Sequence, residues 1–173
     1  LQLAQSGAAG LVTCGRSRAK GEAVAQRITA ATGCPVKFVV ADLESVADCR
    51  AVVAAAETTF HRVDMLVNAA GLTDRGDILS TDETLFNRMF AVNTRAPFFL
   101  MQEVIRRMVR DGIKGAIVNI GSISGFAGQP FISPYCASKG ALSTLTRNTA
   151  FATLRNQIRV NQLDIGWMAS DGE

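Results

Sequence analysis

Three side chains that could together move a proton lie in the second half of the 173-residue sequence. Tyr135 and Lys139 are four residues apart and would share one face of a helix, and Ser122 lies thirteen residues before Tyr135. A phenol can act as a general acid or base. Its ordinary pKa is about 10, and a nearby ammonium favours the phenolate. A hydroxyl could hold the substrate oxygen beside it. A Tyr and a Lys at this spacing are also common on helix surfaces. The surrounding sequence must therefore show whether this pair is functional.

The elements that must position these residues alternate between short apolar strands and helices. Strands are expected at 10–14, 36–40, 64–68, 116–120 and 158–163, and helices at 1–5, 19–32, 45–60, 81–93, 97–111 and 135–154. Ser45 and Thr81 are the expected N-caps of their helices, and Gly7, Gly33 and Gly112 mark helix ends.

This alternation predicts an α/β fold. Strands that are apolar on both faces are typical of parallel sheets covered by helices. Alternating strands and helices imply a doubly wound sheet with right-handed crossovers. The sequence contains no repeat, low-complexity tract or linker, so we expect one domain over residues 1–173. Ligands bind such sheets beyond the carboxyl ends of the strands. The residues found there are Arg16, Asp42, Asn68 to Gly71, Ser122 and Gly166.

Composition argues against several other classes of protein. The net charge is +3 and the basic residues are scattered, which weighs against nucleic-acid binding. No apolar run approaches the roughly 20 residues that span a bilayer. The four cysteines form no C-x-x-C motif and His61 is the only histidine, so no metal site is expected. Free thiols suit a reducing compartment, and we expect a cytoplasmic protein.

Five short motifs follow one another in a meaningful order. They are Asp42-Leu43, Asn68-Ala69-Ala70-Gly71, Asn93, Asn119-Ile120-Gly121-Ser122 and Tyr135-x-x-x-Lys139. In this order and spacing the chain resembles the short-chain dehydrogenase/reductase family. The resemblance implies a Rossmann-like doubly wound sheet with helices on both faces, a nicotinamide cofactor, and oxidation of an alcohol or reduction of a carbonyl.

The resemblance also assigns roles to the candidate catalytic residues. Tyr135 would be the general acid or base, and Lys139 would activate it and hold the nicotinamide ribose. Ser122 would anchor the substrate oxygen; Ser124 competes for this role, but the thirteen-residue offset selects Ser122. Asn93 resembles the family asparagine that holds a water linking the lysine to solvent. Without that role it would be a polar residue inside a helix.

Further residues are implied in cofactor binding. Asp42 resembles the aspartate that hydrogen-bonds the adenine. The small residues after the third strand would let the adenosine half lie against the backbone. With the two catalytic residues, the implied cofactor set is Arg16, Ser17, Asp42, Leu43, Asn68, Ala69, Gly71, Tyr135, Lys139 and Gly166.

The end of the first strand bears on the choice of cofactor. NAD-selective Rossmann sites place an acid at the end of the second strand of the fold. The strand expected at 10–14 corresponds to that second strand, because the family's first strand has no counterpart in this chain. The position of the acid is therefore Gly15, which is followed by Arg16 and Ser17. No carboxylate would repel a 2′-phosphate, and an arginine can pair with one. NADP is therefore favoured, with NAD as the alternative.

The chain departs from the family pattern at both ends. The family's first strand, its glycine-rich phosphate loop and its C-terminal segment have no counterpart in the 173 residues, and Ile165-Gly166 replaces the usual Pro-Gly. We therefore expect these residues to be part of a longer polypeptide, for which an intact mass near 18.4 kDa would be contrary evidence. The main alternative to an enzyme is a non-catalytic relative or fragment of the same fold.

Partners and substrate are less sharply indicated. The helices at 97–111 and 135–154 resemble those that form the family's dimer and tetramer interfaces. Phe98, Phe99, Phe151 and Leu154 could contribute to such an interface or to the core. The substrate would be a small alcohol or carbonyl compound bordered by residues 73–75, 126–132 and 167–168. Polyols, acyl thioesters, steroids and small ketones all remain open.

Overall fold

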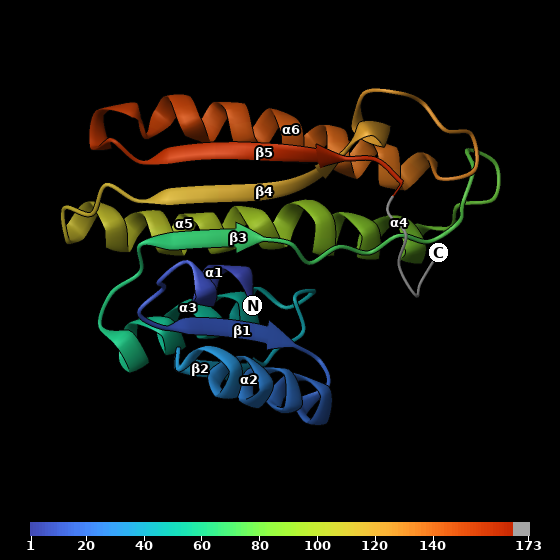
Figure 1. Ribbon diagram of the computed structural model, residues 1–173. Coiled ribbons are helices and arrows are strands. Elements are labelled where there is room, and N and C mark those ends of the chain that lie inside the picture. Colours follow the sequence, from blue (N-terminus) through green and yellow to red (C-terminus); the bar gives the residue numbers. More distant parts are fainter. Residues whose placement is uncertain (168–173) are drawn as a thin grey trace. The chain divides into compact units, whose positions relative to one another are not determined.

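The computed structural model describes residues 1–167, which fall into two compact units (Figure 1). The first comprises Leu1–Val63, and the second begins at Asp64. Each unit has its own parallel sheet: β1 pairs with β2 in the first, and the order in the second is β3-β4-β5.

The first unit alternates helices and strands around a two-stranded sheet. Its elements are α1 (Gln2–Gln5), β1 (Leu11–Gly15), α2 (Arg18–Thr32), β2 (Val36–Val40) and α3 (Val46–Phe60). Ala4, Ile28 and Cys34 form a buried cluster beneath the sheet residues Leu11 and Val36. The predicted ends of α2 and α3 are confirmed: Gly33 ends α2 with φ 72°, and Ser45 caps α3 by accepting a hydrogen bond from the Asp48 N–H.

The second unit contains the three-stranded sheet and the longer helices. Its elements are β3 (Met65–Asn68), α4 (Glu83–Phe90), a π-helical turn η1 (Ala91–Arg95), α5 (Ala96–Arg110), β4 (Ala116–Ser122), a 3₁₀ turn η2 (Ile123–Gly125), α6 (Ser133–Ala152), a 3₁₀ turn η3 (Leu154–Asn156) and β5 (Arg159–Ile165). Helix α6 packs on β4 and β5 (Figure 1). The core residues with almost no exposed surface include Met89, Met101, Val104, Met108, Ile117 and Leu142.

The helix predicted at 81–93 differs from the structure in two ways. Thr81 is not the cap: Asp82 caps α4 by accepting a 2.7 Å hydrogen bond from the Leu85 N–H, while the Thr81 hydroxyl donates to the Asp77 carbonyl. The α-helix also ends at Phe90 and continues through η1 directly into α5. Pro97 explains the change, because it has no N–H to donate to the Asn93 carbonyl four residues earlier.

Two strands are longer than expected. β4 reaches Ser122 and β5 reaches Ile165, so each extends two residues past its predicted end. The register pairs Gly121 with Asp164 and Ser122 with Ile165. Polar residues and a glycine at these positions are more typical of loops, but strand pairing holds them in the sheet.

The α/β class and the parallel strands are confirmed. The single-domain organisation and the handedness of the crossovers remain predictions. Within residues 1–167 no helix has both the length and the apolar character needed to cross a membrane.

Candidate active site

Lys139 is a buried cation at the centre of the second unit. Only 5% of its surface is exposed, and its Nζ donates a 2.8 Å hydrogen bond to the Ile120 carbonyl of β4. Burial lowers the pKa of the Lys139 ammonium below its ordinary 10.5, and the negative charge of Asp164 opposes that change. An ammonium held in so little water is costly to the fold, which is typical of a functional group.

Tyr135 lies one helical turn before Lys139 on α6 and is half-buried. The Lys139 Nζ lies 5.7 Å from the centroid of the Tyr135 ring. The Tyr135 carbonyl accepts a 2.8 Å hydrogen bond from the Ser138 hydroxyl, which stiffens this turn. The predicted helical face therefore brings a phenol and an ammonium together, and this pair can exchange a proton with a bound molecule.

Asn93 connects three segments from the π-helical turn η1. Its Oδ1 accepts a 2.8 Å hydrogen bond from the Leu72 N–H, and its Nδ2 donates to the Leu72 carbonyl and to the Ser138 hydroxyl. The side chain is 1% exposed. These hydrogen bonds occupy the side-chain amide, and they fasten the loop after β3 to the helix that bears Tyr135 and Lys139.

Ser122 ends β4 and is buried next to the turn η2. Its hydroxyl oxygen accepts a 3.2 Å hydrogen bond from the Ser124 N–H, so Ser122 is the residue that caps η2. Ser124 lies inside this turn and is buried. The Ser122 O–H remains able to donate to a ligand, because capping uses only its oxygen.

Two glycines let η2 approach α6 closely. A Cβ on Gly125 would lie 3.1 Å from the carbonyl carbon of Lys139 and 3.1 Å from the Gly140 N. The backbones of η2 and α6 therefore pack closely at Lys139 and Gly140, and a side chain at position 125 would force them slightly apart. This contact places the turn that begins at Ser122 directly against the helix of Tyr135 and Lys139.

A row of polar side chains crosses the sheet of the second unit, and the sequence did not predict it. Asn68 Nδ2 donates to Asn119 Oδ1, and Asn119 Nδ2 donates to the Thr146 hydroxyl, both at 2.8 Å. Thr146 Oγ1 lies 3.0 Å from Gln162 Oε1, and Gln162 Nε2 donates to Asp164 Oδ1. The signal that could have revealed this row is the polar residues at alternate positions of two apolar strands.

The segment after β3 contains several expected cofactor residues. The Asn68 side chain is buried and used within the sheet, and its Oδ1 has no hydrogen-bond partner among the described residues. Ala69 and Gly71 are exposed. A Cβ on Gly71 would lie 3.7 Å from Lys139 Nζ and 3.6 Å from Asn93 Oδ1, so the Gly71 backbone borders the same cluster.

The expected cofactor residues of the first unit lie in turns after β1 and β2. Arg16 is exposed, and its side chain makes no hydrogen bond or ion pair within residues 1–167. The Ser17 hydroxyl caps α2 by accepting from the Lys20 N–H. Asp42 is exposed and accepts a 3.0 Å hydrogen bond from the Glu44 N–H, and Leu43 beside it is half-buried.

Each unit has side chains that suit part of a nicotinamide nucleotide. The Lys139 ammonium has three N–H groups and gives one to Ile120, so two could donate to ribose hydroxyls. The exposed Arg16 guanidinium could pair with a phosphate. Gly166, exposed just past β5, is open to a ligand. Residues 1–167 contain no group of three or more His, Cys, Asp or Glu side chains that could hold a metal ion.

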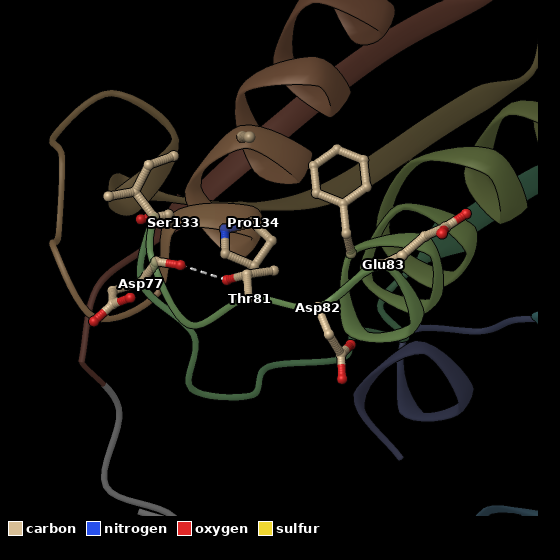
Figure 2. Close-up of a pocket in the computed structure, with 9 residues that line it drawn as sticks. Asp77, Thr81, Asp82, Glu83, Ser133 and Pro134 are labelled. Carbon is tan, nitrogen blue, oxygen red and sulfur yellow. Dashed lines mark hydrogen bonds between the residues drawn. The ribbon is translucent and has the colours of Figure 1, made fainter.

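A cavity of about 390 Å³ lies beside the N-terminus of α6 (Figure 2). Its apolar lining includes Ile78, Phe86, Pro134 and Ala137, and the labelled Asp77, Asp82 and Glu83 are also among its lining residues. Neither Tyr135 nor Lys139 is part of its lining, nor are the borders expected for a substrate. Those borders remain a prediction, and Met168 lies outside the described residues.

Comparison with known proteins gives a consistent result. A family model described as short chain dehydrogenase matches residues 1–173. Galactitol 2-dehydrogenase from Agrobacterium fabrum is 35% identical over 144 residues, which cover 83% of this chain and 56% of that protein. Inactive 2-(S)-hydroxypropyl-CoM dehydrogenase 2 from Xanthobacter autotrophicus is 35% identical over 148 residues, covering 86% of this chain and 64% of that protein. The chain thus spans less than two thirds of the length of these relatives.

Solved structures agree with this result. A gluconate 5-dehydrogenase from Burkholderia cenocepacia J2315, in complex with NADP and tartrate, is 31% identical with a TM-score of 0.89, and the match covers 98% of this chain and 65% of that one. An NAD⁺-bound xylitol dehydrogenase is 26% identical with a TM-score of 0.93, covering 99% and 65%. Because the family model matches every residue and both structures superimpose on nearly the whole chain, this chain belongs to the short chain dehydrogenase family and has its Rossmann-like α/β fold.

Proposed function

We propose that the full-length protein is an NAD(P)-dependent oxidoreductase that interconverts a secondary alcohol and a ketone. The observation that carries this proposal is the buried Lys139 ammonium beside the half-buried Tyr135 phenol. A fold has no structural need for a buried ammonium whose single hydrogen bond within residues 1–167 goes to a backbone carbonyl. A proton-transfer site does need one, because it stabilises the phenolate.

In this proposal each residue of the site has a distinct role. The bound cofactor would supply or accept the hydride. In the reducing direction Tyr135 donates its phenolic proton to the oxygen that becomes the alcohol, and in the oxidising direction it removes that proton. Ser122, held by the contact of η2 with α6, donates a hydrogen bond to the same substrate oxygen. Lys139 stabilises the phenolate by its charge and donates to the ribose.

In this proposal Asn93 takes part in proton transfer to solvent through its backbone carbonyl and not through its side chain. Its side-chain amide is occupied by Leu72 and Ser138. Its carbonyl lacks the usual helical donor, since Pro97 has no N–H. A water on that carbonyl would link the lysine to solvent and return the proton to Tyr135.

NADP is our preferred cofactor, with NAD as the alternative. Support comes from the exposed Arg16 just past β1 and from the absence of an acid at Gly15 or Ser17. A similar structure holds NADP and another holds NAD⁺, so the relatives support a nicotinamide cofactor without selecting one.

Polyols are our preferred substrates. The relatives named above include a galactitol dehydrogenase and a xylitol dehydrogenase. The test is an assay of the full-length protein with galactitol, xylitol, sorbitol and simple secondary alcohols, with NADP⁺ and NAD⁺ in parallel. We expect NADPH formation with a polyol. Cofactor binding without turnover of any alcohol, or of the matching ketones with NADPH, would contradict the proposal.

A non-catalytic relative of the fold is the second candidate. It is favoured by one observation: a protein 35% identical to this chain is named as inactive. A fluorescence titration with NADPH beside the turnover assay discriminates the two functions. Saturable binding with turnover supports an enzyme, and saturable binding alone supports a cofactor-binding scaffold.

We further propose a homodimer or homotetramer located in the cytoplasm. Phe98, Phe151 and Leu154 on and just after the long helices are 44%, 82% and 67% exposed, which favours an interface over the core for these three. Phe99 is half-buried. Cys14, Cys34, Cys49 and Cys136 are free thiols, as suits a reducing compartment. Light scattering of the full-length protein tests the assembly.

A further inference from the structure

Asp164 occupies an unusual place at the end of β5. The register of β4 and β5 pairs Asn119 with Gln162 and Gly121 with Asp164, so these four residues share one face of the sheet. This face is packed by α6, the helix of Tyr135 and Lys139. Gln162 and Asp164 are therefore successive polar side chains of β5 on the face that α6 covers, and α6 carries the candidate proton-transfer site.

The carboxylate of Asp164 is held in place. Gln162 Nε2 donates a 2.5 Å hydrogen bond to Asp164 Oδ1, and the other end of the Gln162 amide lies 3.0 Å from Thr146 Oγ1 on α6. Thr146 in turn accepts from Asn119. A chain of hydrogen bonds thus runs from the buried sheet to the Asp164 carboxylate and limits where that charge can lie.

Gly121 provides the space for this arrangement. A Cβ at this position would collide with Asp164 Oδ1 and with Gln162 Nε2. Any side chain at 121 would push both polar groups away from β4. The glycine is therefore matched to the carboxylate and amide opposite it on β5.

Lys139 reaches β4 at the neighbouring residue. Its Nζ donates a hydrogen bond to the carbonyl of Ile120. The next residue of β4, Gly121, is the one paired with Asp164, so the ammonium and the carboxylate lie beside adjacent residues of the same strand. Within residues 1–167, Tyr135 on the same helix and the uncharged Gly71 and Asn93 lie around the Lys139 ammonium, and Asp164 on β5 is the acidic group whose charge acts on it. Burial lowers the pKa of the Lys139 ammonium, and the Asp164 carboxylate opposes this effect.

We propose that Asp164 is a positioning residue, whose hydrogen-bonded carboxylate keeps the buried Lys139 ammonium charged beside Tyr135. The catalytic meaning of this inference rests on the proposed function. A carboxylate stabilises the charged form of the lysine, so its removal lets Lys139 lose its proton at lower pH. Because Asp164 is exposed, water screens part of its field, and the change will be modest.

The test measures the protonation of Lys139 directly in the full-length protein. Trace acylation with acetic anhydride over a pH series, followed by peptide mass spectrometry, gives the midpoint at which Lys139 becomes a reactive neutral amine. We expect the midpoint to move to lower pH in Asp164→Asn and to return close to wild type in Asp164→Glu. Asp111→Asn, in the turn after α5, is the control and should not move it. The alkaline limb of the kcat profile should move to lower pH in Asp164→Asn alone.

An unchanged midpoint in folded Asp164→Asn would overturn the inference. Equal shifts in Asp164→Asn and Asp111→Asn would also overturn it, because net charge alone would then explain the result. Loss of the native circular dichroism spectrum in both Asp164 variants would show a structural role instead. Absence of turnover in the wild-type protein would contradict the proposed function, while the labelling midpoint would still decide the inference.

Discussion

The two compact units hold their candidate functional residues in opposite ways. In the unit that begins at Asp64, Lys139, Asn93 and Asn119 are almost completely buried and hydrogen-bonded across several elements. In the unit of Leu1–Val63, Arg16 and Asp42 lie exposed in turns after strands. Proton transfer needs groups fixed before the substrate arrives. Selection between two soluble cofactors needs only a charge that the ligand can reach.

The largest expected effect is on activity, from replacing the buried cation. Lys139→Met should reduce kcat at least about 100-fold, the lower range for lost acid–base assistance. Stability at pH 7 should not fall, because the folded state holds the Lys139 proton less tightly than the unfolded state. Burial of the charged Lys139 therefore lowers the free energy of unfolding as long as the lysine is protonated in both the folded and the unfolded state. This destabilisation disappears as the pH rises past 10.5, where both states have lost the proton.

Turnover and thermal unfolding of Lys139→Met should be measured beside Lys114→Met. Lys114 is exposed, and its replacement should change neither property. A large loss of stability in Lys139→Met at pH 7 would contradict the view that the ammonium serves function at a cost to the fold.

The second effect is on stability and concerns the polar row of the same unit. Asn119→Leu removes the partner of both Asn68 Nδ2 and Thr146, and should lower the free energy of unfolding by about 2–3 kcal/mol. Urea denaturation measures this. The control is Asn87→Leu on the exposed face of α4, expected within about 0.5 kcal/mol of wild type. An equal effect of the two changes would show that the row is not important for stability.

The third effect concerns the exposed turn of the first unit. Arg16→Ala should weaken NADPH binding on the order of tenfold, corresponding to about 1.4 kcal/mol for one lost charged contact, and should leave NADH binding unchanged. Fluorescence titration with both cofactors measures it. Arg18→Ala, which breaks an exposed pair with Glu22, is the matched control. Equal weakening of NADPH and NADH would refute selection by Arg16.

The smallest effect tests how the first unit is stabilised locally. Ser45→Ala removes the cap of α3 and should cost about 1 kcal/mol in urea unfolding. Thr58→Ala, exposed in the same helix, should be neutral or slightly stabilising because alanine favours helices. A cost for Ser45→Ala above that of Asn119→Leu would reverse the contrast between the two units.

The sequence predicted most features that depend on local chemistry. The helix ends at Gly33 and Ser45, the strand at 36–40, and the proximity of Tyr135 and Lys139 follow from short-range rules of capping, periodicity and helical spacing. These features need no knowledge of what packs against them, and they agree with the structure.

The features that the sequence did not predict depend on contacts between distant segments. The role of Asp82 as cap was missed because the Thr81 hydroxyl is used by the preceding turn. Asn93 lies in a π-helical turn, and this turn results from Pro97 inside an otherwise continuous helix. The connection of Asn68, Asn119, Thr146, Gln162 and Asp164 requires the strand register, which no local pattern supplies.

The most direct test of the central claim is the effect of Tyr135→Phe on the full-length protein. Single-turnover hydride transfer and NADPH binding should be measured on the same preparation, with Lys114→Met, an exposed position outside the candidate site, as the control. We predict that hydride transfer falls at least about 100-fold while the NADPH Kd changes by a much smaller factor, since phenylalanine keeps the ring and lacks only the hydroxyl that donates the proton. Hydride transfer at the wild-type rate in Tyr135→Phe would contradict it.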